Sequence, residues 1–250
     1  MSDEAIPPKR LPTSPSGQHP LTLLVVPTKE ERHNIDWVME RFQDLNDADL
    51  HVLVSDDDSL DKTWSRAGTW AADDERIYLL RRPGRFKGRG FALRESYKWA
   101  AESENNYEFV LECAANRTDD ILQIPKLLAA LQSGADVVVG SRSRAEGGDD
   151  ASPRQSQGFA RLASGASVSD VESGFRGFRM EALRTIARRL KASDHRIKAE
   201  VIAAARSAKL KVVEVPVPFS QHDTSHPKLG GNSGPVSLLG LWLRRMTKRV

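Results

Sequence analysis

The sequence predicts a single α/β domain with a doubly wound, mostly parallel sheet. Short apolar runs rich in branched residues recur along the chain, and segments with helical spacing of apolar residues follow them. Strands that alternate with helices in this way imply right-handed crossover units and a parallel sheet. The chain has 250 residues, of which 39% are hydrophobic and 28% are charged. This size and composition suit one globular domain.

The first apolar run, 21–26, is expected to be a buried strand that ends at Pro27. We expect Thr28 to cap a helix over about 31–45, because apolar residues recur there at helical spacing. Further strands are expected at 51–54, 76–80, 109–111, 136–140, within 171–180, and at 211–219. Further helices are expected at 61–72, 91–102, 124–132, 181–190, 197–208 and 236–246.

The two ends of the chain differ from its middle. Residues 1–20 are rich in Pro and Ser and predict a disordered arm, and residues 21–232 form the expected domain. Residues 233–250 predict a C-terminal amphipathic helix that is apolar at first and basic at its end. This helix either contacts an anionic membrane surface through residues 236–249 or packs against the sheet.

Composition excludes several classes of protein. The net charge is +3, with 37 basic residues interleaved among 34 acidic ones, so nucleic acid is not an expected partner. The single cysteine, Cys113, excludes an internal disulfide framework and a four-cysteine zinc site, and favours a reducing cytoplasm. No run approaches the ~20 apolar residues of a transmembrane helix. We therefore expect a cytoplasmic protein, at most peripheral to a membrane.

An acidic stretch follows the second predicted strand. Asp56, Asp57 and Asp58 come directly after the apolar residues 52–54. In open α/β sheets, ligands bind beyond the carboxyl ends of the strands. The stretch is either a polar loop in which Asp58 or Ser59 caps the next helix, or part of a binding site. Adjacent carboxylates repel one another unless something binds there, which favours a binding role for Asp56.

Six short motifs follow one another along residues 21–232. They are VPTKEERHN at 26–34, DDDSLDKT at 56–63, KGRGFA at 87–92, GSR at 140–142, SDVESGFRGFR at 169–179 and PKLGGN at 227–232. Their order and spacing resemble the family 2 glycosyltransferases of the GT-A fold, most closely the dolichol-phosphate mannose synthases and related polyprenyl-phosphate glycosyltransferases. The resemblance implies that a sugar moves, with inversion, from a nucleotide-diphosphate sugar such as GDP-mannose to a phosphorylated acceptor such as a polyprenyl phosphate.

The resemblance also implies roles for individual residues. The implied donor site consists of Pro27, Glu31, Asp56, Asp57, Gly88, Gly90, His222 and Lys228. Glu31 could instead be a first-turn helix charge, and the two glycines, which could let backbone N–H groups approach a ligand, could instead form a plain turn. The implied catalytic residues are Glu112, Arg142, Lys198 and Glu200. The residues implied for the acceptor phosphate are Arg142, Arg176 and Arg179, of which the last two could instead pair with nearby acids.

The metal motif departs from the family. Where the family has Asp-x-Asp, this chain has Glu112 and Ala114, and Lys198 aligns with a metal-binding Gln. Glu112 is therefore the one candidate ligand for Mg²⁺ or Mn²⁺. We hypothesise that Lys198 replaces the metal while Glu112 pairs with it or orients the sugar, against the alternative of an ordinary surface lysine. Asp119 and Asp120 are expected to cap a helix.

These departures leave a second function open. A pseudo-glycosyltransferase would bind a nucleotide or a protein partner through the same fold without catalysing transfer. The replaced metal motif favours this reading, whereas the retained Glu31, Asp56, Arg142, Glu200 and Lys228 favour an enzyme.

Overall fold

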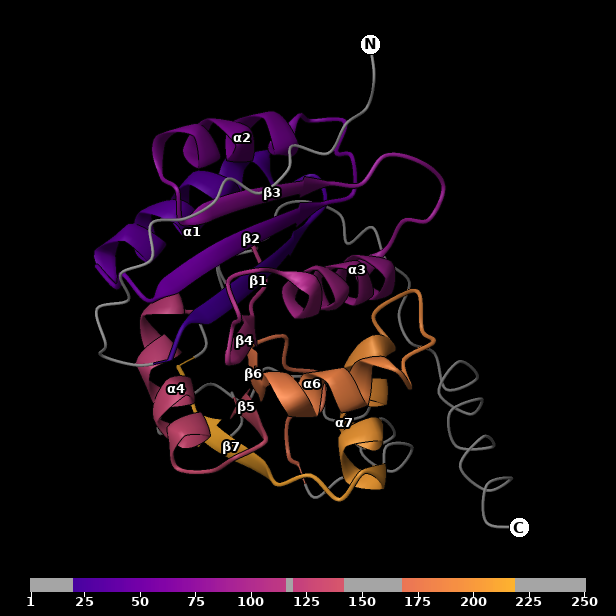
Figure 1. Ribbon diagram of the computed structural model, residues 1–250. Coiled ribbons are helices and arrows are strands. Elements are labelled where there is room, and N and C mark those ends of the chain that lie inside the picture. The colour runs from indigo at the N-terminus through magenta and orange to yellow at the C-terminus, as the bar shows by residue number, and fades with distance from the viewer. Residues whose placement is uncertain (1–19, 116–118, 142–167, 219–250) are drawn as a thin grey trace.

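A computed structural model describes residues 20–115, 119–141 and 168–218. Within these ranges one sheet of seven strands runs through the molecule with helices on both of its faces (Figure 1). The predicted single α/β domain with a mostly parallel, doubly wound sheet is confirmed. The predicted C-terminal helix, and the predicted N-terminal arm except for its last residue, lie outside the described residues.

The sheet has the strand order β3-β2-β1-β4-β6-β5-β7. Its strands are β1 (Thr22–Thr28), β2 (Leu50–Asp56), β3 (Ile77–Arg81), β4 (Phe109–Glu112), β5 (Val137–Ser141), β6 (Arg176–Arg179) and β7 (Val212–Pro216). Only β6 runs antiparallel to its neighbours, β4 and β5. The carboxyl ends of the other six strands therefore meet at one edge of the sheet.

Helices lie between most of the strands, as the alternating pattern predicts. They are α1 (Arg32–Asp44), α2 (Thr63–Asp73), α3 (Arg89–Glu102), η1 (Ile121–Gln123), α4 (Ile124–Gln132), α6 (Met180–Ala187) and α7 (Ile197–Ser207). Among the described residues, no helix is both long enough and apolar enough to cross a membrane.

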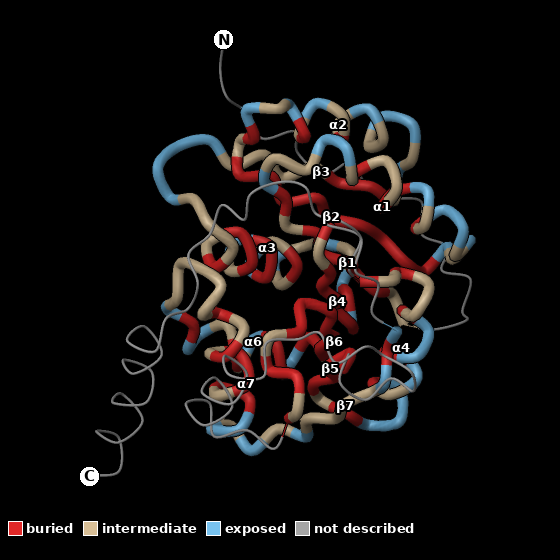
Figure 2. Tube along the Cα trace, turned by 180° about the vertical axis from the view of Figure 1, so that it is seen from behind, coloured by how far each residue is buried: buried red, intermediate tan, exposed pale blue. Residues whose placement is uncertain are grey.

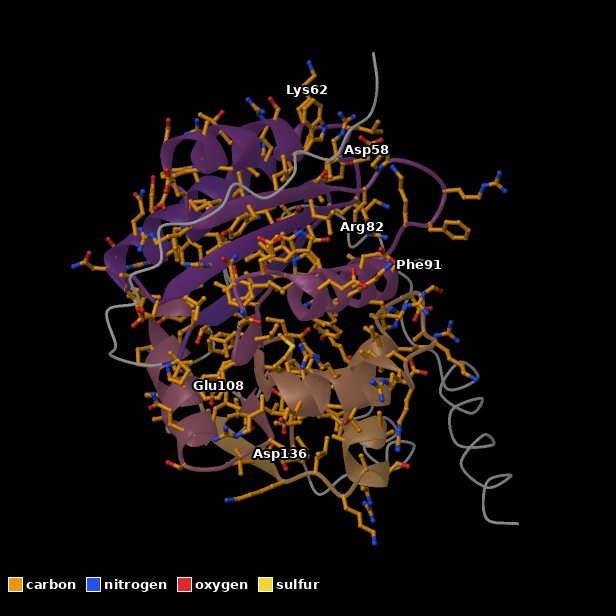
Figure 3. The ribbon with its side chains drawn as sticks, in the orientation of Figure 1. Asp58, Lys62, Arg82, Phe91, Glu108 and Asp136 are labelled. Atoms are coloured by element: carbon orange, nitrogen blue, oxygen red, sulfur yellow. The ribbon has the colours of Figure 1, made fainter. Side chains whose placement is uncertain are left out.

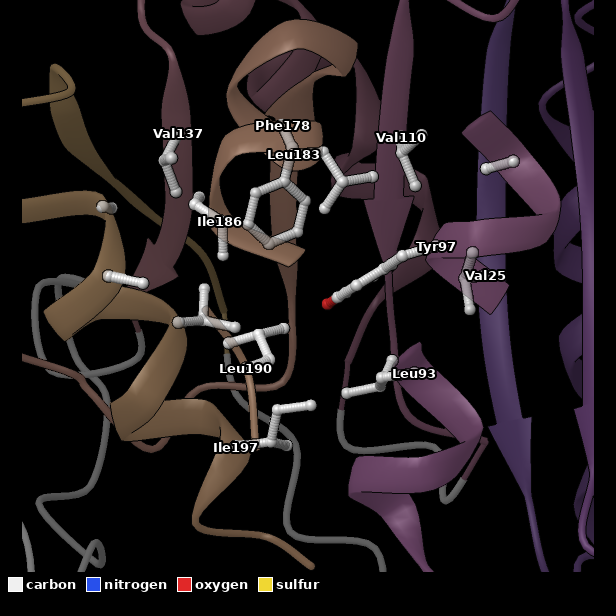
Figure 4. Close-up of a cluster of buried hydrophobic side chains, with 14 of the residues drawn as sticks. Val25, Leu93, Tyr97, Val110, Val137, Phe178, Leu183, Ile186, Leu190 and Ile197 are labelled. Atoms are coloured by element: carbon white, nitrogen blue, oxygen red, sulfur yellow. The ribbon is translucent and has the colours of Figure 1, made fainter. Parts of the chain in front are cut away.

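Two apolar cores lie on the two faces of the sheet. Helices α1, α2 and α4 cover one face, where Ile35, Ala67 and Leu127 are buried. Helices α3, α6 and α7 cover the other, where Tyr97 packs among buried aliphatic residues and Phe178 (Figure 4). Figure 2 shows the strands buried between these layers and the exposed positions on the outer faces of the helices and in the loops.

Several local expectations were wrong in detail. Pro27 does not end the first strand but lies inside β1, level with Ser55. The backbone groups of successive β1 residues point alternately toward β2 and toward β4. Those of Val25 point toward β4, because the Val25 carbonyl oxygen accepts from the N–H of Cys113, the residue after β4. Pro27 faces that same side, beyond Glu112, the last residue of β4. A proline can occupy this position because no ladder hydrogen bond is required from its nitrogen.

The caps predicted for the first two helices were also wrong. Helix α1 has Glu31 at its N-cap, without a side-chain cap bond, because the Thr28 hydroxyl donates to Asp56 instead. Helix α2 begins later than expected, with Lys62 at its N-cap in place of Asp58 or Ser59. The strand expected within 171–180 comprises only β6.

Candidate functional site at the carboxyl edge

The polar residues of the first two motifs meet at the carboxyl ends of β1 and β2. Thr28 and Asp56 are level with each other in the paired strands. Asp56 is fully buried, and its carboxylate accepts from the Thr28 hydroxyl and from both the backbone N–H and the hydroxyl of Ser59, each at 2.8 Å. Burial raises the pKa of Asp56, while these hydrogen bonds counteract the rise. The Asp56 carboxylate is therefore held in one orientation.

The next two acids are paired with basic groups of the loop that joins β3 to α3. The Asp57 carboxylate bonds to the Arg82 guanidinium and, at 2.6 Å, to the Gly88 N–H. Asp58 forms an ion pair with Arg81, whose hydrogen bond lowers the pKa of Asp58. The argument that these acids repel one another without a ligand was therefore wrong, because the chain supplies a partner for each.

The loops after β1 and β2 are bonded to each other. Glu30 accepts from the backbone N–H groups of Leu60 and Asp61, at 2.9 and 3.1 Å. The Glu31 N–H donates to the Thr63 hydroxyl at 2.9 Å. The structure thus brings Pro27 and Asp56, at the ends of β1 and β2, together with Glu31, which lies in one of these two bonded loops.

A buried charged group lies at the end of β4. Glu112 is fully buried and accepts a 2.7 Å hydrogen bond from the Tyr97 hydroxyl. The Arg176 Nε lies 3.7 Å from the other carboxylate oxygen of Glu112. Burial, and then the charge of Glu112, raise the pKa of Tyr97 well above its usual value. The acid that was predicted to be catalytic is thus already paired within the chain.

Arg176 is held at the end of β4, level with Glu112, by groups of the chain itself. Its guanidinium is fully buried and donates to the carbonyl oxygens of Lys198 and Val171, at 2.8 and 2.5 Å. The alternative that Arg176 pairs with a nearby acid is confirmed by its ion pair with Glu112. The partner of Glu112 is therefore Arg176 in place of Lys198.

Arg179 lies at the opposite edge of the sheet. It is level with Phe109, the first residue of β4, and its guanidinium bonds to Leu131 O and lies 3.4 Å from Glu108. Figure 3 shows Asp58 and Arg82 at the carboxyl edge and Glu108 far from them. The structure therefore separates Arg179 from the predicted site residues described at the carboxyl edge, and its alternative pairing with an acid is confirmed.

The residues at the end of β4 do not fit a divalent cation. The charge of Glu112 faces Arg176, and Ala114 has no side-chain ligand, while its backbone N–H donates to Asp119 at 2.8 Å. Within the described ranges, no three His, Cys, Asp or Glu side chains are grouped so that they could hold a metal ion. Of the two acids expected to cap a helix, Asp120 does so, accepting from Leu122 N, whereas Asp119 does not.

The predicted residues Gly88, Gly90 and Glu200 meet at the loop before α7. Gly90 N donates to Ser193 O at 3.1 Å, and a Cβ on Gly88 would lie 2.6 Å from that same oxygen. Gly88 also has φ +118°, which favours glycine. Glu200 accepts from the N–H groups of Lys191 and Ala192. Besides the Asp57 carboxylate at Gly88, the groups that approach these glycines are therefore backbone atoms of this loop, which Glu200 holds in place.

Lys198 lies on the same helix α7 as Glu200. Its Nζ donates to Glu172 O at 2.7 Å, and its backbone carbonyl accepts from Arg176. The remaining predicted site residues, Arg142, His222 and Lys228, lie outside the described residues.

Several residues of this edge were not found by sequence reasoning. Tyr97 has the pattern of a core residue, and Glu30 stands beside the motif residue that was chosen, so neither gave a signal of its own. For Arg89 the sequence did contain a signal that was not used, because this residue stands between the two glycines of its motif. Arg82, which holds Asp57, lies in a loop that is basic throughout.

Comparison with known proteins gives the same pattern along the chain. The model of the family described as glycosyl transferase family 2 matches residues 23–187. An undecaprenyl-phosphate mannosyltransferase of Micrococcus luteus is 30% identical over 220 residues, which cover 84% of this chain and 87% of that protein. A polyprenol monophosphomannose synthase of Mycolicibacterium smegmatis is 27% identical over 223 residues, which cover 85% and 82%.

Solved structures share the fold. A glucosyl-3-phosphoglycerate synthase of Mycobacterium tuberculosis, in complex with Mn²⁺, uridine-diphosphate-glucose and phosphoglyceric acid, superimposes with a TM-score of 0.67. The match covers 91% of this chain and 80% of that chain at 20% sequence identity. At this identity the similarity concerns the fold alone.

Proposed function

The chain belongs to glycosyl transferase family 2, and on this premise we propose that it transfers a sugar from a nucleotide-diphosphate sugar to a phosphorylated acceptor. The names of the mannosyltransferase relatives support a mannosyl group as the sugar and a polyprenyl phosphate as the acceptor. A GDP-mannose-like donor is then the substrate to test first.

The observation that carries this proposal is the cross-linked pair of loops after β1 and β2. Ligands of open α/β sheets bind beyond the carboxyl ends of the strands, and these loops stand there with Pro27, Glu31 and the oriented Asp56. Carboxylate oxygens in fixed positions can accept from a base edge or from ribose hydroxyls. We assign the nucleoside to these three residues, and Asp57, Gly88, Gly90 and Glu200 to positioning the neighbouring loops.

The reaction follows from the acceptor. An oxygen of the acceptor phosphate forms the new bond to the anomeric carbon, while the bond from that carbon to the donor diphosphate breaks and the nucleoside diphosphate leaves with its electron pair. A phosphate is already anionic, so no residue has to remove a proton from it. The protein must orient the two substrates and stabilise the negative charge of the leaving diphosphate. Arg142, Lys198, His222 and Lys228 are the cationic or hydrogen-bonding residues that we propose for this task.

We propose that transfer needs no divalent cation. The pairing of Glu112 with Arg176 and Tyr97 supports this, because the carboxylate charge is compensated within the chain. The protein would act on a lipid-linked acceptor from the cytoplasm, with residues 236–249 as the proposed contact with the membrane surface.

One observation favours a second candidate function. The acid at the end of β4 is buried in an ion pair, which is also the arrangement expected of a protein that binds nucleotide without catalysing transfer. This non-catalytic pseudo-glycosyltransferase would bind a nucleotide or a protein partner, and in either case it would lack the turnover of the enzyme.

The test is a thermal-shift panel of GDP-, UDP-, ADP- and dTDP-sugars, with Mg²⁺, with Mn²⁺ and with EDTA, followed by transfer to a short-chain polyprenyl phosphate. Ligand at ~100 times Kd stabilises the fold by about 2.7 kcal/mol, or several degrees in Tm. We expect one donor to give such a shift in EDTA and to be turned over. A shift without turnover would favour the non-catalytic alternative that binds nucleotide. No shift with any donor would contradict the transferase and favour a non-catalytic protein that binds a protein partner.

A matched pair of variants locates the site. Asp56→Ala removes the oriented carboxylate and is expected to abolish the donor shift. Asp74→Ala removes an acid that is also hydrogen-bonded, to Arg76, but that lies where β3 begins, at the opposite edge. It is expected to keep the shift.

A further inference from the structure

Arg89 carries donor groups that the fold leaves unused. It is the first residue of α3, between Gly88 and Gly90. Its Nε and Nη2 are both buried, and in the described structure neither has a hydrogen-bond partner. Buried polar atoms in proteins almost always have a partner, because burying an N–H without an acceptor is unfavourable. Two such atoms on one guanidinium therefore point to a group that binds there.

The position of this guanidinium follows from its neighbours. Arg89 Nη2 lies 2.9 Å from the point that a Cβ on Gly174 would occupy, and Asp119 Oδ2 lies 3.7 Å from the same point. Asp119 in turn accepts from Ala114 N, just after β4. Burial and Asp119 raise the pKa of the Cys113 thiol, and the charge of Arg89 counteracts that rise. The guanidinium of Arg89 therefore lies at the carboxyl end of β4.

Among the described residues, the acids Glu112 and Asp119 near this point are each bonded to other groups, although one oxygen of Glu112 has no hydrogen bond. Glu112 accepts from Tyr97 and faces Arg176, and Asp119 accepts from the Ala114 N–H. Arg89 thus contributes a positive charge and two free donors to the end of β4. Its Nε–H and Nη2–H lie along one side of the guanidinium plane, where their spacing matches two oxygens of one phosphate or carboxylate.

We propose that Arg89 is a phosphate-binding residue, with Nε–H and Nη2–H each donating to an oxygen of the same phosphate group. The proposal rests on the proposed function, since both the donor diphosphate and the acceptor bring a phosphate to this edge of the sheet. A guanidinium in this position supplies positive charge at the end of β4, where Glu112 is already neutralised.

The experiment measures binding to the full-length chain in EDTA, by calorimetry, in two arms. The donor arm compares a nucleoside diphosphate with its nucleoside, and the acceptor arm compares a short-chain polyprenyl phosphate with its polyprenol. We expect Arg89→Gln to lower the affinity for the phosphorylated ligand of one arm by about 10- to 100-fold, as for a lost charge-assisted hydrogen bond. Affinity for the ligand without phosphate should not change. The arm that responds identifies which phosphate Arg89 binds.

Three further variants serve as controls. Lys98→Gln removes the same charge from an exposed position on the same helix, and is expected to bind both phosphates as the unchanged chain does. Arg89→Lys keeps the charge without the planar pair of donors, and is expected to be intermediate. Gly174→Ala places a methyl group against Nη2 and is expected to displace the guanidinium and weaken the same phosphate ligand. If Arg89→Gln does not fold, as judged by circular dichroism, Gly174→Ala decides.

The outcomes separate this proposal from the proposed function. The role of Arg89 would be overturned if Arg89→Gln bound the phosphorylated ligands of both arms as tightly as the wild-type chain does. It would also be overturned if the wild-type chain bound no phosphate ligand at all. If the chain bound no nucleotide but bound polyprenyl phosphate in an Arg89-dependent way, the proposed donor chemistry would fail while Arg89 kept its role.

Discussion

The two halves of the carboxyl edge differ in how their polar groups are satisfied. Beyond β1 and β2, Asp56, Asp57 and Glu30 each accept hydrogen bonds from neighbouring loop residues. At the end of β4, one oxygen of Glu112, the Nε of Arg176 and two nitrogens of Arg89 are buried without a hydrogen bond. In the first half these carboxylates are bonded within the chain and, among the described residues, Ser55 Oγ is the buried atom without a partner, whereas in the second half the unpaired atoms belong to charged groups. This difference indicates that the first half is a preorganised platform and that the second half needs a ligand to be fully bonded.

The largest expected effect comes from breaking the buried pair at β4. Glu112→Ala leaves the Arg176 guanidinium buried without its counter-charge, and is expected to lower the free energy of unfolding by ~3–5 kcal/mol. Urea denaturation measures the change. Glu108→Ala is the matched control, because Glu108 is 54% exposed and pairs with Arg179 of the same strand β6. A loss of ~1 kcal/mol or less is expected there. Equal losses of unfolding free energy in the two variants would show that the buried pair is no more important for stability than the exposed one.

A change of pH tests the contribution to folding stability of His51, which lies at the amino edge of the sheet, away from both halves of the carboxyl edge. His51, near the amino end of β2, bonds to the Tyr107 hydroxyl, and burial lowers the pKa of His51 from its ordinary value of about 6.5 to about 4. Between these two values the unfolded chain binds a proton that the folded chain does not. Stability therefore falls as the pH drops from 6.5 to 4, by up to about 3 kcal/mol.

The measurement is urea denaturation at several pH values for the unchanged chain and for His51→Gln. We expect the variant to show a shallower loss of stability across this window. An unchanged slope would show that the loss arises from other groups, including those of the carboxyl edge.

A smaller effect is expected at the loop before α7, which contacts Gly88 and Gly90 on either side of Arg89. A Cβ on Gly90 would collide with the backbone of Ala192, which cannot move aside as a flexible side chain does. Gly90→Ala is expected to cost about 1–3 kcal/mol and to weaken donor binding by displacing this loop. In Gly68→Ala the new Cβ would make only an ordinary 3.6 Å contact with Leu79, so the helix should be unchanged or slightly more stable. Tm and donor affinity of both variants provide the comparison.

The smallest effect is expected from removing metal. Because Glu112 and its neighbours do not fit a divalent cation, EDTA should leave donor affinity and turnover unchanged. Turnover that required Mg²⁺ or Mn²⁺ would show that ligands outside the described residues complete a metal site, and the proposal of metal-independent transfer would be wrong.

The sequence by itself determined the alternation of strands and helices and the edge of the sheet that carries the site. Both follow from local patterns: runs such as 52–54 are apolar because they are buried, and the acids of 56–58 stand where the strand ends. The order of motifs also identified the family, because each motif is a short loop at a fixed place in the fold.

Only the tertiary structure decided which charges meet. Arg176 and Glu112 are 64 positions apart in the chain, yet the antiparallel pairing of β6 with β4 places them level with each other. The same pairing carries Arg179 to the opposite edge, although it is only three residues away in the sequence. Pairing across a sheet depends on strand order and register, which are long-range properties that no local pattern encodes. For the same reason the unused donors of Arg89 became visible only once Gly174 and the end of β4 were placed around them.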